Sequence, residues 1–268
     1  THMKCNLKSF LLSAGTLLLT MCFNTTYAQK WDDKIIISQC TDQYVMSLDH
    51  ENPIVKNTKR YVYESNSAIT VNPETAAFYG ENITLDDVSG RGMKLYKNIT
   101  PENVFYDDTK ACIIRGYIDK KGGTCKASFE RTFKDIKYFT RIYLLEEYFI
   151  RDKTLTITIP KQLSGYHIKE MNFKGFNIET SHKSTPEGET FTYTLHNADR
   201  MKEDKMMPPI SNVYPYLLIT GSFSDANALY TWSKEMANVD CTIPNLKELL
   251  QEINAHSKTD EDRISNTY

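Results

Sequence analysis

The sequence predicts a mainly β protein, an antiparallel β-sandwich with a short helical tail at its C-terminus. Three observations support this fold: short runs that alternate apolar and polar residues, clusters of Asn, Pro and Gly between those runs, and helical patterns that begin only after Ser224. The 17 tyrosines and 12 phenylalanines supply large side chains suited to a strand-rich core.

The N-terminus predicts a secretory signal peptide. Lys4 and Lys8 precede an apolar run at 10–23, and a small residue, Ala28, stands at the expected cleavage point. This is the order of charged region, apolar core and cleavage site in signal peptides. The run is shorter than the roughly 20 residues that span a bilayer, and no later segment is apolar for that length. We therefore expect an exported, soluble mature protein without a membrane span.

Two details of this N-terminal segment bear on its processing. Cys22 is an alternative site of lipid attachment, but the bulky Met21 before it fits poorly where such sites carry a small residue. Thr1 and His2, before the first methionine, resemble a cloning scar and are not expected to belong to the fold. The predicted organisation is a signal peptide at 1–28, a β-sandwich domain at 29–223 and a helical tail or linker at 224–268.

Charge and motif content argue against several classes of function. Without the signal peptide, 30 basic residues stand against 34 acidic ones, and this weak, dispersed charge gives no electrostatic basis for binding nucleic acid. No Cys-x-x-Cys or His-Glu-x-x-His motif occurs, and the acidic clusters lack the spacing of calcium loops. We expect no cofactor and no metal, with solvated or hydrogen-bonded histidines at His167, His182, His196 and His256.

The cysteines that remain after cleavage are expected to be structural. Their wide spacing is unlike a disulfide scaffold, and a bond between Cys40 and Cys241 stays open. The Gly-x-Cys at Cys125 resembles the nucleophile of some cysteine hydrolases, but the residues after it alternate with period two and place it in a strand. No later His and Asp pattern supplies a base. We therefore predict no catalytic residue.

The segment 111–133 predicts a β-hairpin. Lys-Lys-Gly-Gly at 120–123 separates two alternating runs, and this four-residue loop pairs Ile118 with Cys125. In that register Cys112 lies opposite Arg131, roughly 20 Å along the ladder from Cys125, which is too far for a disulfide. Both strands become apolar on the same side. The predicted inward residues are Cys112, Ile114, Gly116, Ile118, Cys125, Ala127, Phe129 and Phe133.

Other alternating runs predict further strands. Two runs carry a clear inward set, Leu155, Ile157 and Ile159 in one and Phe191, Tyr193 and Leu195 in the other, with threonines facing outward. The segment 138–150 fits both a helical stripe and an aromatic-rich strand, and its type stays open. The remaining predicted strands lie at 35–40, 60–65, 93–99, 166–173, 175–182 and, after a Pro-rich crossover, 214–220.

Helical spacing of apolar residues predicts the tail. The segments 224–237 and 244–256 both show this spacing, and Pro244 stands at the start of the second, where proline is favoured. Cys241 is expected in the loop between these two helices. A β body thus leads into helices near the C-terminus.

A third helix is predicted to begin at Thr259. Thr259 and Asp262 form a capping box, in which the side chains accept hydrogen bonds from the first free N–H groups of the helix. No C-cap residue or stop signal appears before Tyr268. We therefore expect this helix to belong to a following domain, toward which Ile264 and Tyr268 would face.

The order of elements from Ile35 to Met236 resembles a known family. A strand ends in TIP, another runs into NADRMKEDKMMPP, and YPYLLITGS leads to a Trp-bearing helix; the most specific part is Asn197–Ser222. This succession resembles the domain of unknown function that precedes transglutaminase-like domains in exported bacterial proteins. The resemblance implies a β-sandwich without assigned activity, followed by a papain-like fold that carries the catalytic Cys, His and Asp. None of those catalytic motifs has a counterpart here.

The resemblance and the capped helix favour a non-catalytic accessory domain, a scaffold or recognition module for a transglutaminase-like domain in the same polypeptide. They imply a periplasmic or extracellular protein of a Gram-negative-type bacterium. The alternative is a free-standing secreted β-sandwich that binds carbohydrate or peptide, indicated by 12% aromatic residues, although alternation places most rings inward. A cysteine hydrolase is the third hypothesis, and it predicts fast labelling of Cys125 or Cys241 by a thiol-directed probe.

Overall fold

The chain is mainly β, as predicted. The computed structural model describes residues 33–99, 108–202, 206–237 and 245–267, so the predicted signal peptide, Cys241, Pro244 and Tyr268 lie outside the described residues. Contacts between residues divide the chain into two units, which are described separately. The first is Thr1–Ser164 with Glu170–Leu218, and the second is Gly165–Lys169 with Ile219–Tyr268.

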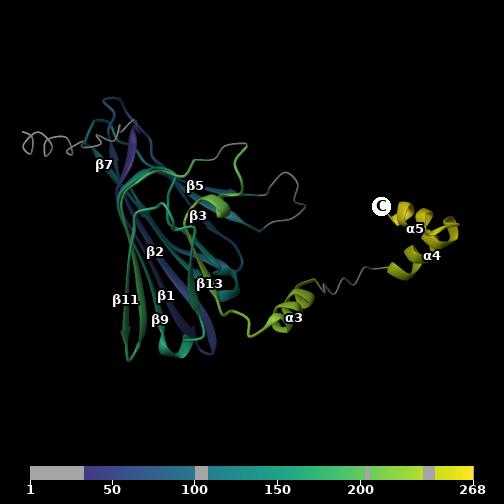
Figure 1. Cartoon of the computed structure of the whole chain (residues 1–268). Helices are drawn as coiled ribbons and strands as arrows, with labels where there is room; N and C mark the ends of the chain where they lie inside the picture. Colours follow the sequence, from purple (N-terminus) through teal and green to yellow (C-terminus); the bar gives the residue numbers. More distant parts are fainter. Residues whose placement is uncertain (1–32, 100–107, 203–205, 238–244, 268) are drawn as a thin grey trace, which may run out of the picture. The chain divides into compact units, whose positions relative to one another are not determined.

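A seven-stranded sheet in the order β11-β12-β9-β1-β2-β7-β4 dominates the first unit, and Figure 1 shows its long strands β11, β9, β1 and β2. All neighbours are antiparallel except β1 and β9, which run parallel, so the expectation of a wholly antiparallel sheet is wrong at this pair. Strands so far apart in sequence are not constrained by a hairpin turn to run in opposite directions. The strands are β1 (Ile35–Asp49), β2 (Asn52–Ser65), β4 (Ile83–Gly90), β7 (Thr124–Phe133), β9 (Phe149–Pro160), β11 (Ile178–Thr185) and β12 (Gly188–Ala198).

One face of this large sheet is buried because its strands alternate with period two. The predicted inward residues of β9 are all buried, and in β12 Tyr193 and Leu195 are buried while Phe191 is half-buried. On the opposite face threonines pair across β9 and β12, for example Thr156 with Thr192. The sequence pattern therefore correctly placed the core side of both strands.

A three-stranded sheet in the order β3-β6-β5 holds the first half of the predicted hairpin. Its strands are β3 (Glu74–Tyr79), β5 (Met93–Asn98) and β6 (Lys110–Arg115). β6 pairs with β3 and β5, whereas β7 pairs with β2 and β4. The predicted hairpin between residues 111 and 133 is therefore wrong: its two strands belong to different sheets.

Contacts of the turn explain this error. The N–H of Gly122 donates to the carbonyl of Ser65 at 2.7 Å, and the Ser65 N–H donates to Gly123 O at 3.0 Å, so the turn is bound to the end of β2. Ile118 forms an isolated bridge with Val71 instead of pairing with Cys125. The inward faces were still predicted correctly, because residues of both strands are buried in one hydrophobic cluster: Cys112, Ile114, Ile118, Cys125, Ala127 and Phe129.

The described cysteines take part in this core without bonding to one another. Cys40, Cys112 and Cys125 are free and buried. Gly116 shows how closely the two sheets approach at this point, since a Cβ added there would lie 2.6 Å from the Sγ of Cys125. A glycine at this position lets the backbone of one sheet pass over the thiol of the other.

The segment 138–150, whose type the sequence left open, forms neither a continuous helix nor a continuous strand. A short 3-10 helix, η1 (Ile136–Tyr138), precedes β8 (Arg141–Tyr143), and β9 begins at Phe149. A second three-stranded sheet has the order β10-β13-β8, with β10 at His167–Met171 and β13 at Tyr216–Thr220. The single-turn helices η2 (Lys161–Leu163) and α2 (Ile210–Val213) complete this part of the chain.

The predicted helices of the tail are present. They are α3 (Ala226–Ala237), α4 (Leu246–His256) and α5 (Asp260–Thr267). The carboxylate of Asp225 caps α3 by accepting the N–H of Ala228 at 2.8 Å. Among the described residues, no helix has both the length and the apolar character needed to cross a bilayer.

The capping box of α5 is confirmed. The Thr259 hydroxyl accepts the N–H of Asp262 at 3.1 Å, and the Asp262 carboxylate accepts the N–H of Thr259 at 3.0 Å. Backbone hydrogen bonds from Lys258 and Thr259 stabilise the charged carboxylate and lower the pKa of Asp262. Ile264 is 64% exposed.

Thr259→Ala is expected to weaken the first turn of α5 by about 1 kcal/mol, because the Asp262 N–H loses its acceptor. Amide hydrogen exchange measures this locally, and we expect exchange in that turn to become roughly fivefold faster. Thr267→Ala, at the other end of α5, is the matched control and should leave the first turn unchanged. Equal exchange in both variants would contradict the capping role.

Candidate functional site

Four charged side chains occupy the buried face of the large sheet. They are Asp42 in β1, Lys59 in β2, Lys153 in β9 and Glu146 in the loop before β9. Asp42 is directly opposite Lys59 across the β1–β2 ladder, and Lys153 is opposite Cys40 across the β1–β9 ladder. The sheet order β9-β1-β2 therefore brings these charges together.

Glu146 is the centre of this group, which we call the buried charge cluster. Its carboxylate accepts hydrogen bonds from Lys153 and from the hydroxyl of Tyr61 at 3.0 Å, and Lys59 Nζ lies 2.8 Å from Oε1. Lys59 Nζ is also 3.5 Å from Asp42 Oδ2. The side chain of Lys153 is 0% exposed and gives a second hydrogen bond to the carbonyl of Leu144 at 2.9 Å. Two lysines and two carboxylates thus balance in charge.

Glu146 and Lys59 favour their charged forms. Burial by itself raises the pKa of Glu146, but the ammonium groups of Lys153 and Lys59 and their hydrogen bonds outweigh it and lower that pKa to about 2. Burial opposes the charge of Lys59, yet the surrounding groups, Glu146 foremost, raise its pKa well above the ordinary value. At neutral pH Glu146 is therefore a carboxylate that accepts hydrogen bonds, not a proton donor.

A polar chain continues from the cluster toward β3. Asn57 donates to Asp42 Oδ1 at 2.8 Å, and Arg131 donates to Asn57 Oδ1 at 2.8 Å. A further N–H of Arg131 reaches the carbonyl of Phe78 at 3.3 Å. The buried amide and carboxylate are thereby satisfied, and one main-chain group of β3 is bound by a side chain of the large sheet.

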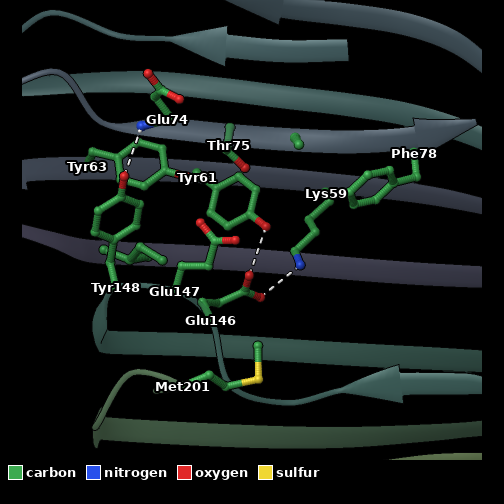
Figure 2. A pocket seen from close by; sticks show the side chains of 12 residues that line it. Lys59, Tyr61, Tyr63, Glu74, Thr75, Phe78, Glu146, Glu147, Tyr148 and Met201 are labelled. Carbon is green, nitrogen blue, oxygen red and sulfur yellow. Dashed lines mark hydrogen bonds and ion pairs between the residues drawn. The ribbon is translucent and has the colours of Figure 1, made fainter. Parts of the chain in front are cut away.

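A pocket of about 180 Å³ opens beside the cluster (Figure 2). Residues of β2 line it together with β3, with the loop before β9 and with Met201. The lining residues are Ile37, Lys59, Tyr61, Tyr63, Glu74, Thr75, Ala76, Phe78, Glu146, Glu147, Tyr148 and Met201.

Three tyrosines form a continuous aromatic wall in this pocket. The rings of Tyr61 and Tyr63 stack with centroids 5.5 Å apart, and Tyr148 meets Tyr63 edge-on at 5.7 Å. The Tyr148 hydroxyl accepts the N–H of Glu74 at 3.0 Å, as the dashed line in Figure 2 marks. Glu147 is exposed, and within the described residues no ion pair engages its carboxylate. The pocket thus combines aromatic rings with an available negative charge.

The described thiols do not have the properties of nucleophiles. Burial raises the pKa of Cys40 to about 12, and it also raises the pKa values of Cys112 and Cys125. The thiolate is the reactive form of cysteine, and it is scarce at neutral pH when the pKa is raised. The structural role that the sequence indicated for Cys125 agrees with its position in β7.

We expect the three buried thiols to react with a thiol-directed chromogenic disulfide at least roughly tenfold more slowly than glutathione at pH 7, because little thiolate forms and access is poor. Full labelling should follow in urea. The measurement uses a chain in which Cys5, Cys22 and Cys241 are replaced by Ser, so that only the three buried thiols report. Fast labelling of Cys125 in the folded chain would favour the cysteine hydrolase hypothesis.

Among the described residues, the histidines and acidic clusters noted in the sequence do not converge on a common site. His196 pairs with Asp152 at 2.6 Å, and His182 stacks on Phe191 with ring centroids 4.4 Å apart. Within the described ranges, no group of three or more His, Cys, Asp or Glu side chains is arranged to hold a metal ion.

Part of the buried charge cluster was predictable from the alternation of the strands. Lys153 stands two residues before the inward Leu155, so the same alternation that buries Leu155 also places Lys153 on the core face. Asp42 lies between the buried Cys40 and Tyr44 in the same way. Glu146 gave no such signal, because it lies in a loop.

Comparison with known proteins shows a similar fold in solved structures but gives no information on chemistry. No protein-family model matches the chain, and no curated protein sequence matches it. A crystal structure from Parabacteroides distasonis, described as that of a "putative protease", is similar over 87% of this chain with a TM-score of 0.58 and 10% identity. An M1 zinc metallopeptidase from Deinococcus radiodurans covers 69% of the chain with a TM-score of 0.36 and 7% identity. This chain spans 49% of the Parabacteroides protein, so it shares the fold of about half of that molecule.

Proposed function

We propose that this chain is a non-catalytic accessory domain of an exported transglutaminase-like protein. It acts as a scaffold or recognition module for a thiol hydrolase domain in the same polypeptide. The observation that carries the proposal is the coverage of the Parabacteroides protein: 87% of this chain matches 49% of that one, which leaves room there for a second domain of similar size. The resemblance of Asn197–Ser222 to the family that precedes transglutaminase-like domains supports the same arrangement.

The chemistry of the described residues fits this role. The buried charge cluster is neutral overall, and the described thiols are held protonated by burial. Such groups stabilise a fold and do not require a substrate. The predicted signal peptide at 1–28 supports export to the periplasm or the exterior of a Gram-negative-type bacterium.

We further propose that the large sheet and the β3-β6-β5 sheet are the two layers of a β-sandwich. The observation in favour is the hydrophobic cluster to which both sheets contribute, with Ile37, Tyr63 and Phe129 from one and Ala77, Cys112 and Ile114 from the other. Side chains from two inner faces that share one core are typical of sandwich packing.

The experiment that tests the accessory role begins with the encoding gene. We expect the reading frame to continue past Tyr268 into a domain that carries a Cys, a His and an Asp. The longer protein should show thiol-dependent hydrolase activity that is lost when that Cys is replaced and retained in Cys40→Ser. A stop codon directly after Tyr268 would remove the proposal.

A second candidate function is a free-standing module that binds carbohydrate or peptide. The tyrosine-lined pocket favours it, because aromatic faces and polar groups are the usual partners of both ligands. Glycan-array screening of the full chain separates the two ligand classes. Glycan binding weakened by Tyr148→Ala would support the carbohydrate branch, and silence on the array would leave the peptide branch.

A further inference from the structure

One edge of the β3-β6-β5 sheet is unpaired. β3 is hydrogen-bonded to β6 on one side, and among the described residues no strand pairs with it on the other. The N–H of Gly116 donates to the carbonyl of Pro73 at 2.7 Å, which fixes Pro73 as a residue whose main chain faces β6. Because the pattern alternates, the main-chain groups of Thr75 and Ala77 also face β6, and those of Glu74, Ala76 and Phe78 face the free edge.

Side chains already occupy both ends of this free edge. The Glu74 N–H is bound by the hydroxyl of Tyr148 at 3.0 Å, and the Phe78 carbonyl accepts from Arg131 at 3.3 Å. Ala76, between them, is exposed and lines the pocket. Among the described residues, no hydrogen bond engages its N–H or its carbonyl. At this edge of β3, the main-chain N–H and carbonyl of Ala76 are therefore available to a further strand.

A peptide strand that pairs with Ala76 fits this arrangement. The residue opposite Ala76 in an antiparallel strand exchanges two hydrogen bonds with it, and the Glu74 carbonyl and the Phe78 N–H can each add one more. Successive side chains of such a strand point to opposite faces. The two side chains that flank the central residue therefore lie next to Thr75 and Ala77, on the inner face where the pocket opens.

The charge of the pocket selects the kind of side chain. Lys59 is neutralised by Glu146 and Asp42, and Glu74 pairs with Arg115. Glu147 remains as a carboxylate without an ion pair in the described part of the chain, among the rings of Tyr61 and Tyr148 that line the same pocket. A carboxylate with aromatic faces favours a cation.

We propose that the free edge of β3 binds an extended peptide segment of another protein through the main chain of Ala76, and that the tyrosine-lined pocket accepts a lysine or arginine side chain of that segment. The binding mode is strand addition, in which main-chain hydrogen bonds give affinity and the pocket gives specificity. This inference deepens the second candidate function and stands whether or not a catalytic domain follows.

The test uses the full chain labelled with ¹⁵N and the peptide acetyl-Thr-Lys-Val-Lys-Thr-amide, which places valine opposite Ala76 and both lysines toward the pocket. We expect saturable binding with a dissociation constant below about 1 mM and a shift of the Ala76 amide resonance. Two control peptides should bind at least roughly tenfold more weakly: one N-methylated at the valine, which removes a main-chain donor, and acetyl-Thr-Glu-Val-Glu-Thr-amide, which reverses the charge.

Variants of the chain separate the two parts of the proposal. Ala76→Pro removes the outward N–H without touching a hydrogen bond to β6, and binding should be lost. Glu147→Gln should weaken the lysine peptide several-fold and leave its acetyl-lysine counterpart unchanged, while Glu187→Gln, an exposed residue outside the pocket, serves as the matched control.

Each outcome decides the proposal. If Ala76→Pro disturbs the fold, as judged by circular dichroism and thermal unfolding, the N-methylated peptide tests the same hydrogen bonds on the unchanged chain. Absence of a shift at Ala76 at millimolar peptide, or equal affinity for the lysine and glutamate peptides, would overturn the inference. A stop codon after Tyr268 would remove the accessory role and leave this binding untouched, so the two failures are distinguishable.

Discussion

Glu146→Gln is expected to lower the free energy of unfolding by about 3–5 kcal/mol at pH 7. The substitution removes the negative charge that balances Lys153, whose side chain is 0% exposed, and Lys59. An uncompensated charge in the interior is far more costly than the loss of an exposed pair. Urea unfolding followed by circular dichroism measures the change.

Two further variants show whether the effect comes from the buried charge. Glu130→Gln removes a comparable carboxylate from an exposed pair with Arg60 at 3.9 Å, and it should cost no more than about 0.5 kcal/mol. Adding Lys153→Met to Glu146→Gln should recover part of the loss, because Lys59 keeps Asp42 as its partner. A Glu146→Gln variant as stable as Glu130→Gln would contradict a structural role for the cluster.

The pH dependence of stability follows from the lowered pKa of Glu146. The folded value is about 2 and the ordinary value is 4.5, so the unfolded chain binds this proton first as the pH falls. The stabilisation is fully present above about pH 4.5 and is lost between about pH 4.5 and pH 2. Denaturation curves over this range should show a steeper loss for the natural chain than for Glu146→Gln, because the variant lacks the titrating group.

Phe129→Ala is expected to destabilise the chain by about 3–5 kcal/mol. Phe129 is 2% exposed and belongs to the cluster that the large sheet and the β3-β6-β5 sheet share, so its removal leaves a cavity that both sheets line. Phe78→Ala is the matched control, because Phe78 is 51% exposed, and it should cost less than about 1 kcal/mol. Similar unfolding midpoints in urea for the two variants would show that the sheets do not depend on a common core.

The faces of the strands were predictable from the sequence because burial follows period two within a single strand. The inward positions of Leu155 and Ile157 needed no knowledge of any other strand. The capping box at Thr259 was predictable for the same reason, since its partner is three residues away.

Partners distant in sequence were not predictable in this way. The Lys-Lys-Gly-Gly turn has hairpin chemistry, yet its backbone is hydrogen-bonded to Ser65 at the end of β2, and β6 pairs with β3 instead of β7. Glu146 acquires its role only when β1, β2 and β9 place Lys59 and Lys153 beside it. A local pattern reports which side of a strand is buried, whereas the choice of neighbour depends on the whole fold.

The parallel pairing of β1 with β9 has a consequence for folding during synthesis. Residues 36–45 of β1 pair with residues 149–158 of β9. The central strand of the sheet is therefore synthesised long before one of its two neighbours. Contacts between residues so far apart in sequence slow folding, because the entropy of closing the intervening chain is lost before the contacts form. Until β9 is available, one side of β1 is an open strand edge, and an open edge is a site where other chains can pair and aggregate.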